Sequence, residues 1–392
     1  RASMSDRPDG DFILFSPPSV DAREMDAVAA AVGSGWLTTG PRVAEFERRF
    51  AEFVGAPAAL AVSSGTDAMQ IALAALGVGP GAEVITSTMT FCSTAHVIEH
   101  VGATPVLVDV EPDTLNLDPD AVAAAVTPRT KAILPVHLYG HPCDMDPVMD
   151  IAREHHLQVV QDAAHALPAS YKGRMVGGDT TPAAFSFYDT KNITTGEGGM
   201  LTGSPEFIQA ARPWVLHGIS RDAYSRYAEG GSWSYDVILP GLKSNMTDVQ
   251  AAIGIEQLKK LSAFQERRHQ IYEAYDAAFA EMGEIEIPRR RADTSPALHL
   301  YVIRLNLERL SLDRAQFIEE LRQRRVGSSV HFIPVHMLTY YGQKYGYRPE
   351  SFPVAYANFE RIVTLPLHPG LSDAQVTRVV DAVTDVIATH RR

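Results

Sequence analysis

Cysteine is scarce in this sequence: the 392 residues contain two, Cys92 and Cys143, which excludes a small disulfide-held scaffold and favours a reducing cytoplasm. No run approaches the roughly 18 consecutive apolar residues of a membrane helix, and the first ten residues are too polar for a signal peptide. Basic residues are also in the minority, with 35 Lys and Arg against 47 Asp and Glu. The net charge of −12 argues against a nucleic acid partner but leaves room for a local basic pocket that holds a small phosphorylated molecule.

Short apolar segments alternate with longer helix-forming segments between residues 58 and 203. The expected strands are 58–63, 83–87, 104–110, 131–136, 157–162, 183–187 and 199–203, and intervening segments such as 66–76 and 144–155 have helical apolar spacing. This alternation predicts an α/β fold with a mostly parallel seven-stranded sheet covered by helices on both faces. Ligands of such sheets bind beyond the carboxyl ends of the strands, so the residues that directly follow each strand are candidates for chemistry.

A second, smaller unit follows in the sequence. The helix-forming run 247–282 leads out of the sheet, and the turn-rich segment 287–297 precedes a further strand–helix–strand pattern. We predict a large cofactor-binding domain over residues 15–250 and a small α/β domain over 251–392. Residues 1–20 can pack on either domain, including the small one.

Two candidate sites follow the first and fifth expected strands. Ser63, Ser64, Gly65 and Thr66 lie between a strand and a helix, where small residues let backbone amides close on an anion such as a phosphate. An ordinary helix cap is the alternative. Asp162 ends a buried strand, so its carboxylate needs a positive partner such as a protonated heterocycle nitrogen; a helix cap or a salt bridge would also satisfy it. His165, three residues later, can donate to a ring oxygen or serve as a hydrogen-bonded structural residue.

Two further candidates follow the strands at 183–187 and 83–87. Lys191 precedes a glycine-rich turn, and a desolvated lysine has the lowered pKa that a Schiff-base nucleophile requires; a surface lysine in a hairpin is the alternative. Ser186 adds a hydroxyl to the same strand. Phe91 can lie flat on a planar cofactor or pack in the core. An anion cradle, an acid, an aromatic ring and a lysine together describe pyridoxal phosphate better than a nucleotide.

Other cofactors fit the sequence less well. A nicotinamide nucleotide would call for a G-x-G-x-x-G segment after the first strand, and a nucleoside triphosphate for G-x-x-x-x-G-K; neither motif occurs. His137, His141 and Cys143 lie close together in the chain, but they lack an obvious fourth ligand for zinc. We therefore expect no metal site.

Several longer segments carry a family resemblance. They are GSGWLTTGP (33–41), SSGTDAM (63–69), TMTFCSTAH (88–96), PVHLYGHPCDM (135–145), QDAAHA (161–166), FSFYDTKNITTGEGGM (185–200), KSNMTDVQAAIG (243–254) and HFIPVHML (331–338). In this order they resemble the DegT/StrS family of sugar aminotransferases. The resemblance implies a fold-type-I pyridoxal phosphate enzyme, which is a homodimer with active sites at the subunit interface.

The resemblance also implies residue roles. Lys191 would bond covalently to the cofactor and move protons, Asp162 would hold the pyridine nitrogen protonated, His165 would approach the ring hydroxyl oxygen and Phe91 would stack on the ring. Gly65, Thr66 and Ser186 would hold the phosphate. Many members carry Asn-Tyr-Arg before Met-Thr-Asp, as a contact to the neighbouring subunit. This chain reads Lys243-Ser244-Asn245 instead, so Lys243 and Asn245 are the candidates.

The reaction implied is transfer of an amino group from glutamate to a keto sugar linked to a nucleotide, with pyridoxamine phosphate as the intermediate form of the cofactor. The segment KNITTGEGGM resembles members that aminate the sugar's 4-position. Candidate substrate contacts are Trp36, Thr38, Arg221, His336 and Tyr340. The alternatives are amination at the 3-position, an aminocyclitol aminotransferase acting on a keto-inositol, a sugar dehydratase, whose members commonly lack the lysine, and a non-catalytic regulator that binds the cofactor.

Overall fold

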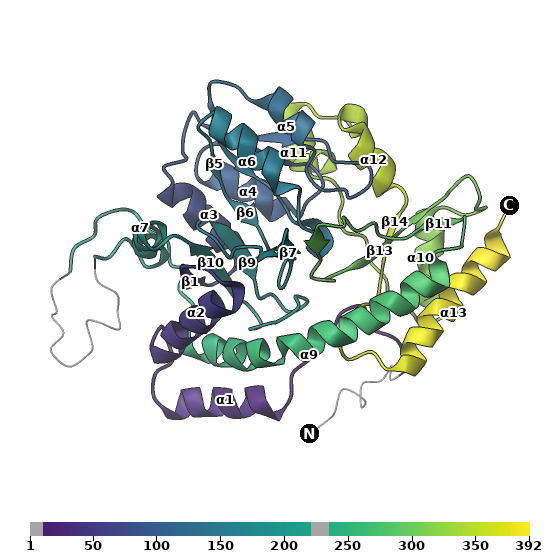
Figure 1. Cartoon of the computed structure of the whole chain (residues 1–392), viewed down its shortest axis with the longest axis horizontal. Coiled ribbons are helices and arrows are strands. Elements are labelled where there is room, and N and C mark those ends of the chain that lie inside the picture. The colour runs from purple at the N-terminus through teal and green to yellow at the C-terminus, as the bar shows by residue number, and fades with distance from the viewer. Residues whose placement is uncertain (1–10, 221–234) are drawn as a thin grey trace.

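The computed structural model describes residues 11–220 and 235–392 (Figure 1). Within these ranges, eight of the strands before residue 204 form two four-stranded sheets, β3-β2-β4-β5 and β1-β10-β9-β6. The two sheets are continuous, because β5 and β6 belong to one extended stretch and Val136, just after β4, pairs in parallel with Asp162 of β6. The bounds are β1 Ala58–Val62, β2 Glu83–Ser87, β3 Thr104–Val108, β4 Thr130–Leu134, β5 Gln158–Val159, β6 Gln161–Asp162, β9 Ala183–Ser186 and β10 Gly199–Gly203.

Counted with β5 and β6 as one, the described part of the sheet has seven strands. β10 is antiparallel to β1 and β9, and the other pairings between strands of this sheet are parallel. The predicted mostly parallel seven-stranded sheet is therefore confirmed.

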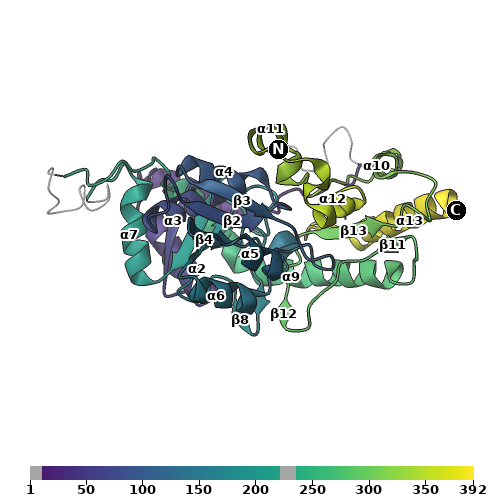
Figure 2. The same cartoon turned by 90° about the horizontal axis from the view of Figure 1, so that it is seen from above.

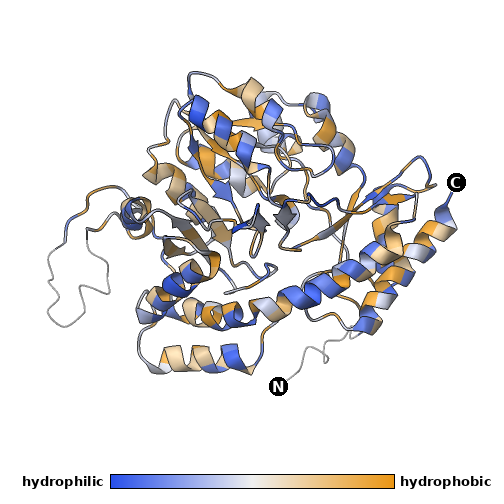
Figure 3. Ribbon diagram, in the orientation of Figure 1, coloured by the Kyte–Doolittle hydropathy of each residue, from blue (hydrophilic) through white to orange (hydrophobic). Residues whose placement is uncertain are grey.

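Helices cover both faces of this sheet, which explains why its strands are continuous apolar runs. Successive strand residues point to opposite faces: Leu60 and Leu201 pack against α3, α4 and α7, whereas Ala59 and Met200 pack against α2 and the first half of α9. α5 and α6 cover the β2–β4 part of this second face. The bounds are α2 Pro41–Val54, α3 Gly65–Ala75, α4 Cys92–His100, α5 Pro119–Ala125, α6 Met145–Glu154, α7 Pro205–Val215 and α9 Asp248–Phe279. Figure 3 shows the hydrophobic strands inside these helices.

A second unit lies beyond α9 and contains an antiparallel sheet in the order β11-β13-β14. Its core includes residues of β13, β14, α10 and α13. The bounds are β11 Ile285–Glu286, β13 Tyr301–Leu305, β14 Ile362–Leu365, α10 Arg314–Gln323, α11 Thr339–Tyr345, α12 Pro353–Phe359 and α13 Asp373–His390. Figure 2 shows this unit at one end of the molecule and the large sheet at the other.

The long helix α9 connects the two units. A capping box starts it, in which Thr247 accepts from the Gln250 amide and the Gln250 side chain accepts from the Thr247 amide. Ile255 packs in the core of the large sheet, whereas Tyr275 packs in the core of the second unit, which also contains Ile13. The division at residue 250 stays a prediction, and we propose that α9 is the link across it.

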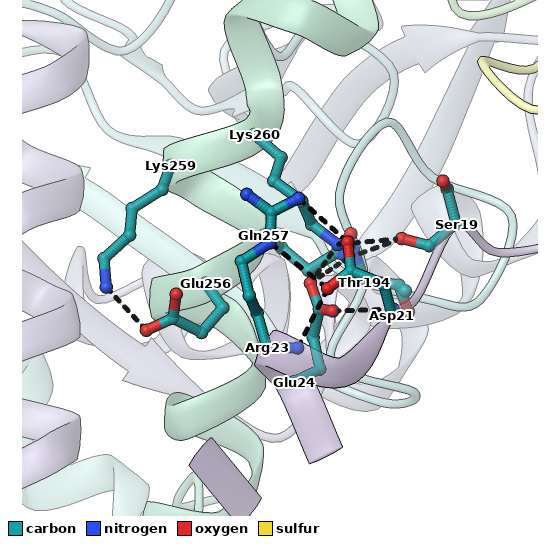
Figure 4. Close-up of polar contacts among 9 residues, drawn as sticks. All are labelled: Ser19, Asp21, Arg23, Glu24, Thr194, Glu256, Gln257, Lys259 and Lys260. Atoms are coloured by element: carbon teal, nitrogen blue, oxygen red, sulfur yellow. Dashed lines mark hydrogen bonds and ion pairs between the residues drawn. The ribbon is translucent and has the colours of Figure 1, made fainter. Parts of the chain in front are cut away.

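A buried polar cluster holds α1 (Ala22–Gly33) against α9 (Figure 4). Lys260 forms an ion pair with Glu24, and each of the two side chains is 4% exposed. The Gln257 side chain donates to Glu24 and to the Ser19 carbonyl, both at 2.8 Å, and accepts from the Thr194 amide at 3.3 Å. The cluster therefore joins the N-terminal segment, α1 and the loop that follows Lys191.

Two short pairings bring the segment before β13 to the large sheet. β12 (Thr294–Ser295) pairs with β7 (Ser170–Tyr171), which in turn pairs with β8 (Arg174–Met175). The chain then passes through Ala297, whose amide donates to the Gly140 carbonyl, and enters β13. Among the helices of the described ranges, we find none long and apolar enough to cross a membrane.

Candidate active site

A cavity of about 530 Å³ lies at the carboxyl ends of the parallel strands. Its walls come from the loops after β1, β2, β6 and β9 and from two segments of the second half of the chain, 299–300 and 329–332. The sequence-predicted residues that line it are Gly65, Thr66, Phe91, Asp162, His165, Ser186 and Lys191. Residues far apart in the sequence are thus brought to one place, as expected for a parallel sheet.

The turn between β1 and α3 forms one wall. Ser64 caps α3, and its hydroxyl accepts from the Asp67 amide at 3.0 Å. Gly65 lies so close to β9 that a Cβ at this position would be 2.9 Å from Cβ of Ser186. A side chain does not fit there, and the start of α3 lies open to the cavity together with the Ser186 hydroxyl.

Asp162 lies on the floor of the cavity and is 5% exposed. Its Oδ2 accepts from the Thr94 hydroxyl at 2.8 Å, and its Oδ1 accepts from the Ala164 amide at 3.1 Å. Burial raises the pKa of Asp162, although these two hydrogen bonds and the charge of Lys191 act in the opposite direction. A buried carboxylate with two hydrogen bonds is well placed to hold a cationic group in the cavity.

Lys191 shares this cavity with Asp162. Its amide donates to the Tyr188 carbonyl at 2.9 Å, in the loop between β9 and β10. Loss of water contact lowers the pKa of Lys191 to about 8, although the charge of Asp162 opposes this shift. The amine is therefore partly free of its proton near neutral pH, as a nucleophile requires.

Two aromatic groups complete the predicted set. Phe91 precedes α4, is 56% exposed and lies 5.7 Å from the Phe332 ring, measured between centroids. His165 is buried, and its Nδ1 accepts from the Tyr139 amide at 3.2 Å. Burial lowers the pKa of His165 well below its ordinary value, with the charge of Lys191 as the second cause.

The sequence interpretation missed several lining residues, among them His299, His331, Phe332 and Glu197. His299 lies just before β13, and His331 and Phe332 lie in a loop before α11. None of these three follows a strand of the large sheet, so the strand-end rule could not find them. The segment HFIPVHML was a signal for His331 and Phe332 only through the family resemblance.

Four of the predicted contact residues are not among the described residues that line this cavity. Lys243 is exposed and donates to Asn245, which in turn donates to Thr39 at 2.9 Å. Trp36 is partly exposed and Thr38 is exposed, and the Thr38 carbonyl accepts from the Asp248 amide at 3.1 Å. These residues form a surface group beside the start of α9.

The structure also separates two further predicted substrate contacts, His336 and Tyr340, from the cavity. His336 is 1% exposed, and its two ring nitrogens contact the Thr88 hydroxyl at 2.7 Å and the Pro349 carbonyl at 3.0 Å. The Tyr340 hydroxyl donates to Glu99 at 3.2 Å on the outside of α4. Neither side chain lines the cavity, because His336 is held between Thr88 and Pro349 and Tyr340 contacts Glu99 of α4. Arg221 lies outside the described residues.

The three residues weighed as zinc ligands have other partners. The His137 ring contacts the Gln161 side chain at 3.0 Å and accepts from the Cys143 amide at 3.0 Å, and the Cys143 thiol donates to the Val136 carbonyl. In the described ranges, His, Cys, Asp and Glu side chains form no group of three or more that could hold a metal ion.

The fold and the cavity define a class of protein. A buried acid and a lysine of lowered pKa line one cavity at the strand ends of an α/β sheet, and the model of the DegT/DnrJ/EryC1/StrS aminotransferase family matches residues 18–384. The chain belongs to this family and is therefore an aminotransferase. The predicted family and the predicted fold type are confirmed.

Three relatives illustrate this similarity. The spore coat polysaccharide biosynthesis protein SpsC of Bacillus subtilis is 47% identical over 378 residues, which cover 96% of this chain and 97% of SpsC. Spr1654 of Streptococcus pneumoniae, solved in its PMP form, is 36% identical with a TM-score of 0.90, and the match covers 96% and 99% of the two chains. The sugar aminotransferase CalS13 of Micromonospora echinospora is 27% identical with a TM-score of 0.85, over 95% and 99% of the chains.

Proposed function

We propose that this aminotransferase uses pyridoxal phosphate to move an amino group from L-glutamate to the 4-position of a keto sugar linked to a nucleotide. The observation that carries the proposal is the shared cavity of Lys191 and Asp162. Relatives support it, since Spr1654 is known in PLP and PMP forms and CalS13 is a sugar aminotransferase. The 4-position rests on the resemblance of KNITTGEGGM, residues 191–200.

The cavity residues suit this cofactor in charge and in shape. The cavity volume of about 530 Å³ is within the usual range of roughly 300–1,000 Å³ for a small-molecule site. Gly65, Thr66 and Ser186 would hold the phosphate at the start of α3, where backbone amides and the helix dipole favour an anion. Asp162 would hold the ring nitrogen, His165 the ring oxygen and Phe91 the ring face.

When bound, pyridoxal phosphate supplies an aldehyde that captures amines and a ring that accepts an electron pair. Lys191 contributes a partly deprotonated Nζ, which serves as nucleophile and then takes and returns protons. Thr94 and Ala164 hold the Asp162 carboxyl in place, where its charge would keep a proton on the ring nitrogen of the bound cofactor. Phe91 and Phe332 form an apolar part of the cavity wall.

The proposal includes a homodimer in the cytoplasm. Lys243 and Asn245 lie at the surface, away from the cavity of their own chain, so we propose that they contact the cofactor phosphate bound by a partner subunit. Trp36 and Thr38 lie beside them, and we propose that this surface group takes part in substrate binding across the interface.

The test is spectroscopic and chemical. The purified protein should be yellow, and L-glutamate should bleach the colour; keto-sugar nucleotides and keto-inositols are then screened by mass spectrometry for amine incorporation. Lys191→Ala should remove the covalent absorbance band and turnover, whereas Lys172→Ala, an exposed lysine paired with Asp146, should retain both. Normal turnover in Lys191→Ala would refute the assigned role, and amination of keto-inositols alone would replace the sugar substrate.

A further inference from the structure

The side chain of Asn192, the residue after Lys191, is buried, and its three hydrogen bonds allow only one orientation of its amide group. Its Nδ2 donates to two carbonyl oxygens, those of Leu167 and Ala297, both at 2.8 Å. Carbonyl oxygens only accept, so these contacts fix which end of the amide is nitrogen. The remaining atom, Oδ1, lies 3.0 Å from Nδ1 of His299 and must accept a hydrogen from it.

Asn192 therefore determines the tautomer of His299. Burial lowers the pKa of His299 well below its ordinary value, and the charges of His165, Lys191 and Arg268 add to this effect. A neutral imidazole carries one hydrogen, and Asn192 requires it on Nδ1. Nε2 of His299 is then a bare lone pair on a ring that lines the cavity.

His165 has the opposite tautomer. Its Nδ1 accepts from the backbone amide of Tyr139, which can only donate, so the single hydrogen of this neutral ring is on Nε2. The centroids of the His165 and His299 rings are 4.4 Å apart. The cavity wall thus presents a hydrogen-bond donor from His165 beside a hydrogen-bond acceptor from His299.

The backbone of His299 is also fixed. Arg268 of α9 is 2% exposed and donates to the carbonyls of Leu298, His299 and Leu367 at 3.3, 3.2 and 2.9 Å. Both the ring and the main chain of His299 are therefore held in place, although nothing in the proposed reaction so far uses its Nε2.

We propose that His299 is a hydrogen-bond acceptor for the amino group that enters the cavity, and that Asn192 is the positioning residue that keeps its Nε2 free for this purpose. The amino group is that of Lys191 or, if the proposed function holds, that of L-glutamate. Amines are the ligand class that this arrangement favours, because an N–H meets the bare Nε2 and a carboxylate or phosphate oxygen does not.

The first test reads the tautomer directly and needs neither cofactor nor substrate. Full-length protein labelled with ¹⁵N-histidine is compared by NMR with His299→Gln, which assigns the His299 signals among the 14 histidines. The wild type should carry hydrogen on Nδ1. Asn192→Ala should release this tautomer. Asn358→Ala, a buried asparagine elsewhere that donates to the Val354 carbonyl, is the control and should change nothing at His299.

The second test separates the cavity role of His299 from its contact with Asn192. Glutamine places a polar atom near the Nε2 position, and asparagine places one near the Nδ1 position. With L-glutamate as the probe and the cofactor colour as the readout, KM for His299→Asn should exceed that for His299→Gln about twofold to tenfold, the effect of one hydrogen bond, with a smaller change in kcat.

The outcomes decide the two proposals separately. Hydrogen on Nε2 of His299 in the wild type, an unchanged tautomer in Asn192→Ala, or a higher KM for the Gln than for the Asn variant would each overturn this inference. A wild-type protein that carries the expected tautomer but does not respond to L-glutamate would refute glutamate as the donor in the proposed function, and would leave the inference resting on the NMR result.

Discussion

The buried ion pair between Glu24 and Lys260 gives a prediction about stability whose magnitude can be worked from the structure. Each side chain is 4% exposed, and removal of one partner of a buried pair costs about 3–5 kcal/mol because the other charge is left without compensation. In Glu24→Gln, Asp21 remains 3.3 Å from the Lys260 amine. We therefore expect the lower end of the range, about 3 kcal/mol.

The matched control is the second pair in Figure 4, Lys259 with Glu256, whose side chains are 48% and 18% exposed. Glu256→Gln should cost about 0.3–0.5 kcal/mol, as exposed helix pairs do. The unfolding entropy is about 2.1 cal/mol/K per residue for a chain of 392 residues. The free-energy losses therefore correspond to a decrease in Tm of about 4 °C for Glu24→Gln and of less than about 1 °C for Glu256→Gln. Thermal unfolding followed by circular dichroism at pH 7 measures both.

The same pair predicts a pH dependence. Burial by itself would raise the pKa of Glu24. The hydrogen bonds to its carboxylate, first of all that from Lys260, lower the pKa by more than burial raises it, so the folded-state pKa is below the ordinary value. The stabilisation is therefore present above the unfolded pKa of about 4.3 and is lost as the pH falls through the folded pKa. The difference between wild type and Glu24→Gln should shrink below about pH 4.

A double variant completes this test. Glu24→Gln with Lys260→Met removes the uncompensated charge and should recover part of the loss, since apolar replacement of a buried pair is often close to neutral. Equal decreases in Tm for Glu24→Gln and Glu256→Gln at pH 7 would refute the reasoning from burial.

Three further predictions concern the cavity. Asp162→Asn should lower the transamination rate at least about 100-fold with the cofactor still bound, and stopped-flow spectroscopy checks this. Gly65→Ala should weaken pyridoxal phosphate binding about tenfold, measured by equilibrium dialysis, because the new Cβ would approach Ser186 to 2.9 Å. Capture of the cofactor by Lys191 should speed up as the pH rises through about 8, where the amine loses its proton, and a midpoint near that of an exposed lysine, about 10.4, would contradict the lowered pKa.

The sequence by itself determined the large sheet and the residues that directly follow its strands. Asp162, Ser186 and Lys191 could be placed in one cavity because parallel strands end at the same edge of a sheet. Gly65 and Thr66 followed from the same rule, applied to the turn between β1 and α3. For these residues the local pattern and the topology contain the information.

Only the tertiary structure decided the rest of the wall. His299 and His331 come from the second half of the chain, and they reach the cavity through the β12–β7 pairing and the packing of the second unit along α9. Packing against Thr88 and Phe352 buries His336, one of the candidate substrate contacts. Contacts between residues more than a hundred positions apart depend on how whole helices and strands pack against one another. The local periodicity of the sequence does not predict that packing. The tautomer of His299 is the clearest case, because it depends on an asparagine 107 positions earlier in the chain.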